Sequence, residues 1–253
     1  MLKVRVIPTL LYKSVGLVKG VGFNSWRRVD TVLPAIKVYN MREVDELILV
    51  DIEATKEGRD PDYESIRDFS RECFVPFCVG GGICNIEQIR QLLRAGADKV
   101  AINSAAYDNL ELITEGARLF GSQCIVASID CRKIDGSYRC FSHNGEVDTG
   151  YSLEEWVQKV VEAGAGEILL TSVELDGTMQ GRRRDDKDRD RVSECSGDCI
   201  RRCRQLRRYV SGNYAGRSIG GCGGEHLSFY GTDPKGGKGI SGRAGHTGTN
   251  QIM

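Results

Sequence analysis

The sequence predicts an α/β protein of the (βα)8 (TIM) barrel class, in which about six βα units precede residue 181 and the C-terminal part is irregular. Three observations predict this class. Short apolar, β-branched runs alternate with segments of helical periodicity. One βα unit recurs within the chain. Five of the six apolar runs end in a polar residue, and a barrel gathers such strand ends around one mouth.

Six runs are expected to be strands, and in chain order they cover residues 4–9, 46–51, 76–80, 99–103, 124–130 and 167–171. Helix-like segments lie between them. In residues 85–94, for example, apolar side chains occur at Ile86, Ile89, Leu92 and Leu93. Strands that alternate with helices are typical of parallel βα units.

The internal repeat consists of residues 96–104 and 164–172, which match position by position in residue type. Buried parallel strands occur in open doubly wound sheets and in closed barrels, so the repeat does not choose between them. The polar strand ends favour a barrel, because an open sheet would collect only those near its switch point. These ends are Thr9, Asp51, Asn103, Asp130 and Thr171.

The 253 residues have a formal net charge of zero, which averages two unlike parts. Residues 1–180 hold 20 Lys and Arg against 27 Asp and Glu, whereas residues 181–253 hold 15 against 8. Val, Ile, Leu and Phe fill only 9 of the last 73 positions, too few for a separate core. We therefore expect a barrel portion over residues 1–181 and a disordered or non-family tail over residues 182–253.

No run of about 18 apolar residues is present, so no membrane span is expected. The first residues lack the pattern of a signal peptide, and a cytoplasmic protein with reduced thiols is expected. Cys195, Cys199 and Cys203 recur every four residues, but metal sites use closer pairs, so neither a metal nor a cofactor is expected. Six other cysteines show no paired spacing: Cys73, Cys78, Cys84, Cys124, Cys131 and Cys140.

A phosphate-binding turn is predicted after the third strand. Gly80, Gly81 and Gly82 allow backbone N–H groups to approach an anion, and a helix begins soon after them. Asn103 and Ser104 add short donors after the fourth strand. A flexible turn is the alternative for the glycines alone, and the added donors favour the phosphate site.

Three carboxylates are candidates for proton transfer. Asp130 ends an apolar strand, where a carboxylate is costly unless it is solvated or hydrogen-bonded. Asp51 and Asp176 occupy comparable places. One carboxylate can act as a base while another donates or orients. Helix N-caps and loop turns are the alternative for Asp51 and Asp176.

Charged residues also occur at the opposite strand ends: Arg5, Glu46, Lys99 and Glu167. Two cations and two anions near the axis would form a ring of ion pairs that closes the bottom of the barrel. Isolated surface ion pairs are the alternative.

Residues 1–181 resemble the cyclase subunit of imidazole glycerol phosphate synthase, a (βα)8 barrel of histidine biosynthesis. The carrying motifs are Leu-Val-Lys-Gly at 17–20, Val-Asp-Glu-Leu at 44–47, Val-Gly-Gly-Gly-Ile at 79–83, Gly-Ala-Asp-Lys-Val at 96–100 with Asn103, Phe-Gly-Ser-Gln at 120–123, Ile-Asp at 129–130, and residues 164–172 with Asp-Gly-Thr at 176–178.

The resemblance implies site roles. Asp130 would be the general base. Gly82, Asn103 and Ser104 would hold one substrate phosphate, and the mouth would be lined by Lys19, Asp51, Thr171, Asp176 and Gly177. The ring Arg5, Glu46, Lys99 and Glu167 would gate ammonia from a glutaminase subunit docked beneath the barrel as a heterodimer. The phosphorylated small-molecule substrate would take up that ammonia as an imidazole ring closes and an aminoimidazole carboxamide ribotide leaves.

One position departs from the family. Its second catalytic aspartate is expected where this chain has Leu11, and leucine cannot donate a proton. Residues 10–13, Leu-Leu-Tyr-Lys, resemble paralogues from surface-polysaccharide clusters. The alternative function is therefore a non-cyclising ammonia conduit and scaffold for sugar amidation in polysaccharide biosynthesis.

The tail does not continue the family pattern. Read one nucleotide later, the codons of residues 195–205 and 225–235 are compatible with the family's seventh strand and the end of its eighth, which suggests out-of-frame translation. Six strands alone would leave the first and sixth with unpaired edges. A nucleic-acid arm, with Arg201, Arg202, Arg204, Arg207 and Arg208 around Tyr209, is a weaker alternative, and no nucleic-acid or membrane partner is expected.

Overall fold

The computed structural model describes residues 5–14, 16–178, 207–211 and 226–229. Eight of its strands pair into a closed ring, because β10 pairs with both β7 and β11, and β12 pairs with both β11 and β1. In ring order they are β1 (Val6–Lys13), β4 (Leu47–Asp51), β5 (Phe77–Gly80), β6 (Lys99–Ile102), β7 (Ile125–Ile134), β10 (Glu167–Ser172), β11 (Arg207–Ser211) and β12 (His226–Phe229).

The predicted barrel class and its six strands are confirmed. Strands β1, β4, β5, β6, β7 and β10 follow one another in that order, and each neighbouring pair is parallel. Each lies within a few residues of the run that predicts it, except that β1 and β7 extend four residues further at their C-terminal ends. These extensions are the arms of two hairpins described below.

The expectation of unpaired edges on the first and sixth strands is wrong. β12 pairs with β1 through Val6 to Thr9, and β11 pairs with β10 through Glu167 to Thr171. Without β11 and β12, the edge N–H and C=O groups of β10 and β1 would have no hydrogen-bond partners. β12 runs antiparallel to both of its neighbours, unlike the parallel strands of this barrel class.

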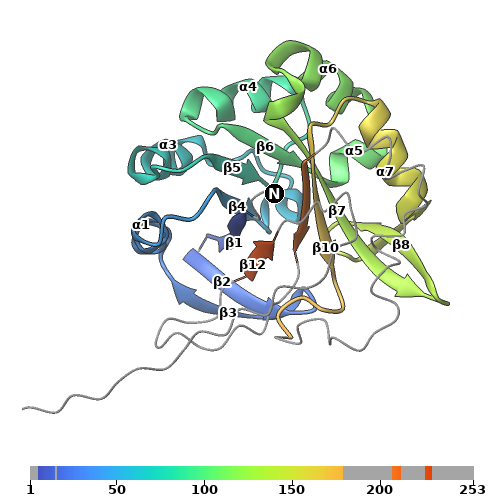
Figure 1. Ribbon diagram of the computed structural model, residues 1–253, viewed down its shortest axis with the longest axis horizontal. Helices are drawn as coiled ribbons and strands as arrows, with labels where there is room; N and C mark the ends of the chain where they lie inside the picture. Colours follow the sequence, from blue (N-terminus) through green and yellow to red (C-terminus); the bar gives the residue numbers. More distant parts are fainter. Residues whose placement is uncertain (1–4, 15, 179–206, 212–225, 230–253) are drawn as a thin grey trace, which may run out of the picture.

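Helices surround this ring on the outside (Figure 1). α1 packs beside α3, α3 beside α4, and α4 beside α6. The described helical segments are α1 (Val32–Met41), α2 (Ala54–Glu57), α3 (Tyr63–Glu72), α4 (Ile86–Ala95), α5 (Ser104–Asp108), α6 (Glu111–Phe120), η1 (Ser122–Cys124) and α7 (Leu153–Glu162). None of them is long and apolar enough to cross a membrane.

Local sequence signals fix where two of these helices begin. Asn85 caps α4 and Ser152 caps α7, and in each case the side chain three residues later, Gln88 or Glu155, bonds back to the cap backbone. Gly96 ends α4 in a left-handed conformation with φ of 111°, which glycine adopts without strain.

The strands alternate their side chains between two apolar layers. On β4, Leu47 and Leu49 belong to the large core beneath the helices, whereas Ile48 points into the barrel. The inner layer takes one side chain from each of six strands: Ile7, Ile48, Cys78, Ala101, Val126 and Leu169. The barrel interior is therefore packed and apolar between its two ends.

Two hairpins at the C-terminal ends of the strands lie outside the sequence prediction. The first is formed by the extension of β1 with β2 (Gly16–Val21) and β3 (Asn24–Asp30), and the second by β7, β8 (Ser137–Ser142) and β9 (Val147–Ser152). The Asp135-Gly136 turn, with φ of 49° and 84°, is a strong hairpin signal that the sequence contained.

Candidate active site

The C-terminal ends of the strands enclose a cavity of about 290 Å³. Seven of the predicted site residues line it: Asp51, Gly82, Asn103, Ser104, Asp130, Thr171 and Asp176. Thr9 and Leu11 contribute from β1. The structure thus brings together polar side chains that are far apart in the chain, as the strand-end pattern predicted.

Asp130 lies within β7 and is 6% exposed. Its Oδ2 accepts a hydrogen bond of 2.7 Å from Asn103 Nδ2. Burial raises the pKa of the Asp130 carboxyl to about 7, the bond from Asn103 opposes that rise, and the charge of Asp176 adds to it. A carboxylate with a pKa near neutral pH can take up a proton and give it back during turnover.

Asn103 precedes α5 but does not cap it, because its amide is directed to Asp130. Among the described residues its Oδ1 is buried without a hydrogen-bond partner. A buried acceptor without a hydrogen bond costs free energy, so we expect this oxygen to accept a hydrogen bond from a ligand in the cavity.

The glycine turn after β5 is closely packed. Gly82 has φ of 70°, and a Cβ there would lie 2.8 Å from both Ala54 Cβ and Arg59 O. Its N–H makes a long bond of 3.3 Å to Thr55 Oγ1. Only glycine fits this turn without a shift of its neighbours, and Gly82 and Ser104 line the same cavity.

Asp51 serves the turn as well as the cavity. Its Oδ1 accepts from the backbone N–H groups of Glu53 and Ala54 at 2.9 and 3.1 Å. Arg59 Nη1 lies 2.8 Å from its Oδ2. The loop-turn alternative weighed from the sequence is therefore part of what Asp51 does.

Lys19 and Gly177 differ from the other candidates because, in the described chain, they are not among the residues that line the cavity. Lys19 is buried on β2. Gly177, with φ of 69°, packs against Gly20, where a Cβ would meet the carbonyl oxygen at 1.9 Å. Asp176 O also accepts from Gly22 N at 2.9 Å, so this loop holds the first hairpin in place.

Several cavity residues were missed by the sequence reasoning. Phe23 and Trp26 come from the first hairpin, Arg59 from the loop after α2, and His143 and Asn144 from the turn between β8 and β9. The hairpin turns were the signal that could have located them. Of the described residues, no group of three or more His, Cys, Asp or Glu side chains is arranged to hold a metal ion. Cys195, Cys199 and Cys203 lie outside the described residues, as do most of residues 182–253.

We expect Asp130 to make stability depend on pH in an unusual direction. Its pKa of about 7 in the folded state exceeds the ordinary aspartate value of the unfolded state, so the folded state binds the proton more tightly. The free energy of unfolding therefore falls as pH rises from the ordinary aspartate pKa through the folded pKa. The free energy of unfolding of Asp130→Asn should exceed that of the wild type by about 4 kcal/mol at pH 8 and by little at pH 4. Urea titrations at both pH values measure this, and an equal difference at both would contradict it.

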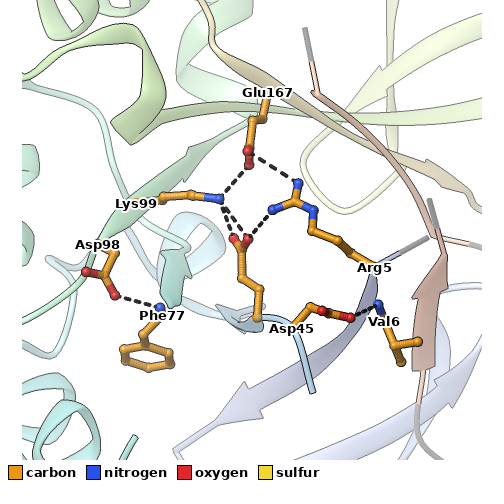
Figure 2. Close-up of polar contacts among 8 residues, drawn as sticks. Arg5, Val6, Asp45, Phe77, Asp98, Lys99 and Glu167 are labelled. Atoms are coloured by element: carbon orange, nitrogen blue, oxygen red, sulfur yellow. Dashed lines mark hydrogen bonds and ion pairs between the residues drawn. The ribbon is translucent and has the colours of Figure 1, made fainter. Parts of the chain in front are cut away.

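At the other end of the barrel, four charged side chains form a ring of ion pairs (Figure 2). Lys99 Nζ lies 2.7 Å from Glu46 Oε2 and 2.8 Å from Glu167 Oε2. Arg5 Nη1 and Nη2 lie 3.2 and 3.5 Å from the same two carboxylates. Glu46 is fully buried, and burial raises the pKa of Glu167 despite the opposing effect of Lys99. The side chains meet as a ring and not as isolated surface pairs.

Breaking this ring is expected to destabilise the fold. Glu46→Gln removes a buried anion that faces both Lys99 and Arg5, and should lower the free energy of unfolding by about 3 kcal/mol. Glu72→Gln is the matched control, since the Lys37–Glu72 pair is exposed and should contribute less than about 1 kcal/mol. Urea unfolding of both variants measures the difference, and equal losses would show that the ring adds nothing special.

The chain is similar to known proteins over most of its length. It matches the histidine biosynthesis protein family over residues 5–189. It is 47% identical over 182 residues to the provisionally named imidazole glycerol phosphate synthase subunit hisF2 of Pseudomonas aeruginosa. It is 46% identical over 182 residues to the imidazole glycerol phosphate synthase subunit HisF of Streptococcus sanguinis, and 47% identical over 182 residues to that of Bacillus cereus. Each alignment covers 72% of this chain and 72% of the relative.

Proposed function

The chain belongs to the family of histidine biosynthesis proteins, and from this premise we propose that it is the cyclase subunit of an imidazole glycerol phosphate synthase. Ammonia joins a phosphoribulosyl-type substrate in the cavity, an imidazole ring closes, and an aminoimidazole carboxamide ribotide leaves. The observation that carries the proposal is Asp130, a buried carboxylate at the cavity with a pKa of about 7. The names of the relatives support the same activity.

Asp130 acts as the general base in this proposal. Ring closure requires that protons leave the attacking nitrogen and the substrate carbon skeleton, and Asp130 is placed to accept one of them. Asn103 holds the carboxylate by its amide and keeps it oriented between turnovers. Asp176 lies close enough to raise the pKa of Asp130, so the two carboxylates act on one region of the substrate.

The substrate phosphate nearest this base is assigned to the turn after β5. Gly82, Asn103 and Ser104 line that side of the cavity, and Asp51, Thr171 and Asp176 line the remainder of the mouth. Lys19 and Gly177 are proposed to support the substrate site through the first hairpin, which Asp176 O holds by its bond to Gly22 N.

Ammonia is proposed to enter through the ring of Arg5, Glu46, Lys99 and Glu167 from a glutaminase subunit. The ring closes the end opposite the cavity, and the inner apolar layer lies between the two ends. Ammonia that travels inside the barrel stays unprotonated and away from bulk water. Met41 ends α1 and Phe74 follows α3, in the segments that lead to the ring ends of β4 and β5, and their exposed apolar side chains suit a docked partner.

Ammonia-dependent cyclisation by the purified chain tests this function. We expect imidazole glycerol phosphate to form from the phosphoribulosyl substrate in ammonium salt, and to form from glutamine once the glutaminase subunit is added. Stimulation of the glutaminase without any imidazole product would support the non-cyclising conduit instead. The names of the relatives do not favour that alternative.

For the residues after 181 we propose out-of-frame translation. The family match ends at residue 189, and β12 runs antiparallel where this barrel class uses parallel strands. Resequencing of the coding region tests the idea. A reading frame that is intact across codons 195–235, together with tail peptides found by mass spectrometry of the native protein, would overturn it.

A further inference from the structure

The turn between β8 and β9, residues 143–146, lines part of the cavity. His143 N donates a hydrogen bond of 3.0 Å to Ser104 Oγ. Asn144 Nδ2 donates one of 2.6 Å to Ile52 O. Glu146 forms an ion pair with Lys56. The turn is thus bound at three points to segments that follow β4 and β6.

These contacts bind the turn to the segments that follow the two neighbours of β5. Ile52 follows β4 and Ser104 follows β6, and β5 lies between β4 and β6 in the sheet. A segment that joins Ser104 to Ile52 therefore bridges the segments on either side of the glycine turn at Gly81 and Gly82. His143, which lines the same cavity, lies at the Ser104 end of this span.

The backbone of the turn is held in an uncommon conformation. His143 and Asn144 have φ of 50° and 58°, in the left-handed region that only a few per cent of non-glycine residues adopt. Such residues persist where the surroundings fix them, and they cluster at ligand sites. The bonds from His143 N and Asn144 Nδ2 hold these two residues, and the imidazole lines the cavity from this supported turn.

Acidic side chains outnumber basic ones among the described residues that line the cavity. Five aspartates line it: Asp51, Asp60, Asp108, Asp130 and Asp176. The basic side chains of the described lining are Arg59 and His143, and Arg59 is already bound by Asp51 and Glu57. A phosphate dianion beside so many carboxylates needs further donors or positive charge.

His143 has a ring nitrogen to offer. Its Nδ1 lies 3.0 Å from Ser142 Oγ, which fixes the orientation of the ring. Within the described part of the chain, Nε2 makes no hydrogen bond. Ser104 Oγ accepts from His143 N, so the hydroxyl proton of Ser104 is left to donate to a ligand.

We infer that His143 is a substrate-binding residue for the phosphate that the glycine turn and Ser104 hold. Its backbone N–H orients the Ser104 hydroxyl toward the phosphate, and its imidazole Nε2–H donates to a phosphate oxygen. This inference rests on the proposed function for its phosphorylated substrate, and it adds a ligand that neither the barrel strands nor the glycine turn supplies.

Binding of inorganic phosphate to the full chain, measured by titration calorimetry, tests the inference. His143→Asn keeps the backbone N–H and suits the left-handed conformation, and it should raise the Kd for phosphate about tenfold or more. Asp135→Asn is the matched control, because Asp135 also has a left-handed backbone, with φ of 49°, but sits in an exposed turn. The control should bind phosphate as the wild type does.

A second measurement uses the unmodified chain. Phosphate should slow the reaction of His143 with diethyl pyrocarbonate several-fold, read by peptide mass spectrometry with an added histidine-containing peptide as the internal reference. Unchanged phosphate affinity in His143→Asn, or no protection of His143, would overturn the inference. Phosphate binding needs no turnover, so these results are independent of whether the chain forms an imidazole product, which is the test of the proposed function.

Discussion

Replacing Leu11 with aspartate is expected to raise the rate of ammonia-dependent cyclisation by about 10²- to 10⁴-fold, the range that a positioned acid or base contributes. Leu11 lies on β1, its Cα is paired with that of Val50 on β4, and its side chain lines the cavity that holds Asp130. The family resemblance places a second catalytic aspartate at this position. A carboxyl group there would supply the proton donor that leucine lacks.

The control for this gain is Leu11→Asn, which has nearly the shape of aspartate but no titratable proton. Initial rates for the wild type and both variants are measured with saturating ammonium. We expect the aspartate variant alone to gain activity. Equal rates in the aspartate and asparagine variants would mean that an acid at position 11 has no part in this chain's reaction.

Asp130→Asn is expected to lower kcat by about 10²- to 10⁴-fold, because the amide keeps the shape of the carboxyl group but cannot accept a proton. The loss is best measured in the Leu11→Asp background, where the starting rate is higher. Asp148→Asn is the matched control. Asp148 lies on β9, pairs with Arg139 at the surface and is not among the residues that line the cavity. Its rate should stay close to that of the parent.

The pH profile gives this loss a signature that a folding defect would not produce. With a pKa of about 7, Asp130 is mostly protonated below neutral pH and unable to act as a base. The ratio kcat/KM, whose pH dependence reports the ionisation of the free enzyme, should therefore rise with pH and level off above about pH 8. A flat profile through neutral pH would contradict the assignment of Asp130 as the base.

The barrel strands were predictable because each is a short apolar run whose burial and period are local properties of the sequence. The run at 46–51 became β4, with Leu47 and Leu49 outward and Ile48 inward. The polar residues that end these runs were predictable as a group, because parallel strands bring their C-terminal ends to one side. The ring of Arg5, Glu46, Lys99 and Glu167 followed from the same rule applied to the opposite ends.

The remainder depended on contacts between distant segments. Nothing local to His143 shows that its backbone reaches Ser104, 39 residues away in sequence. The pKa of Asp130 depends on burial and on Asn103 and Asp176, which lie in segments that follow β6 and β10. The pairing of β11 and β12 with the barrel edges likewise depends on backbone groups of β10 and β1. No pattern within the tail predicted it.

The most direct test of the proposed cyclase activity uses 15N-labelled ammonium. The purified chain is incubated with the phosphoribulosyl substrate, and the position of the label in the products is determined. We predict that the label appears in the imidazole ring of the product and that Asp130→Asn lowers the rate of its incorporation by about 10²-fold or more. The absence of label from any imidazole product, in both the wild type and the Leu11→Asp variant, would contradict the claim that this barrel catalyses ring closure.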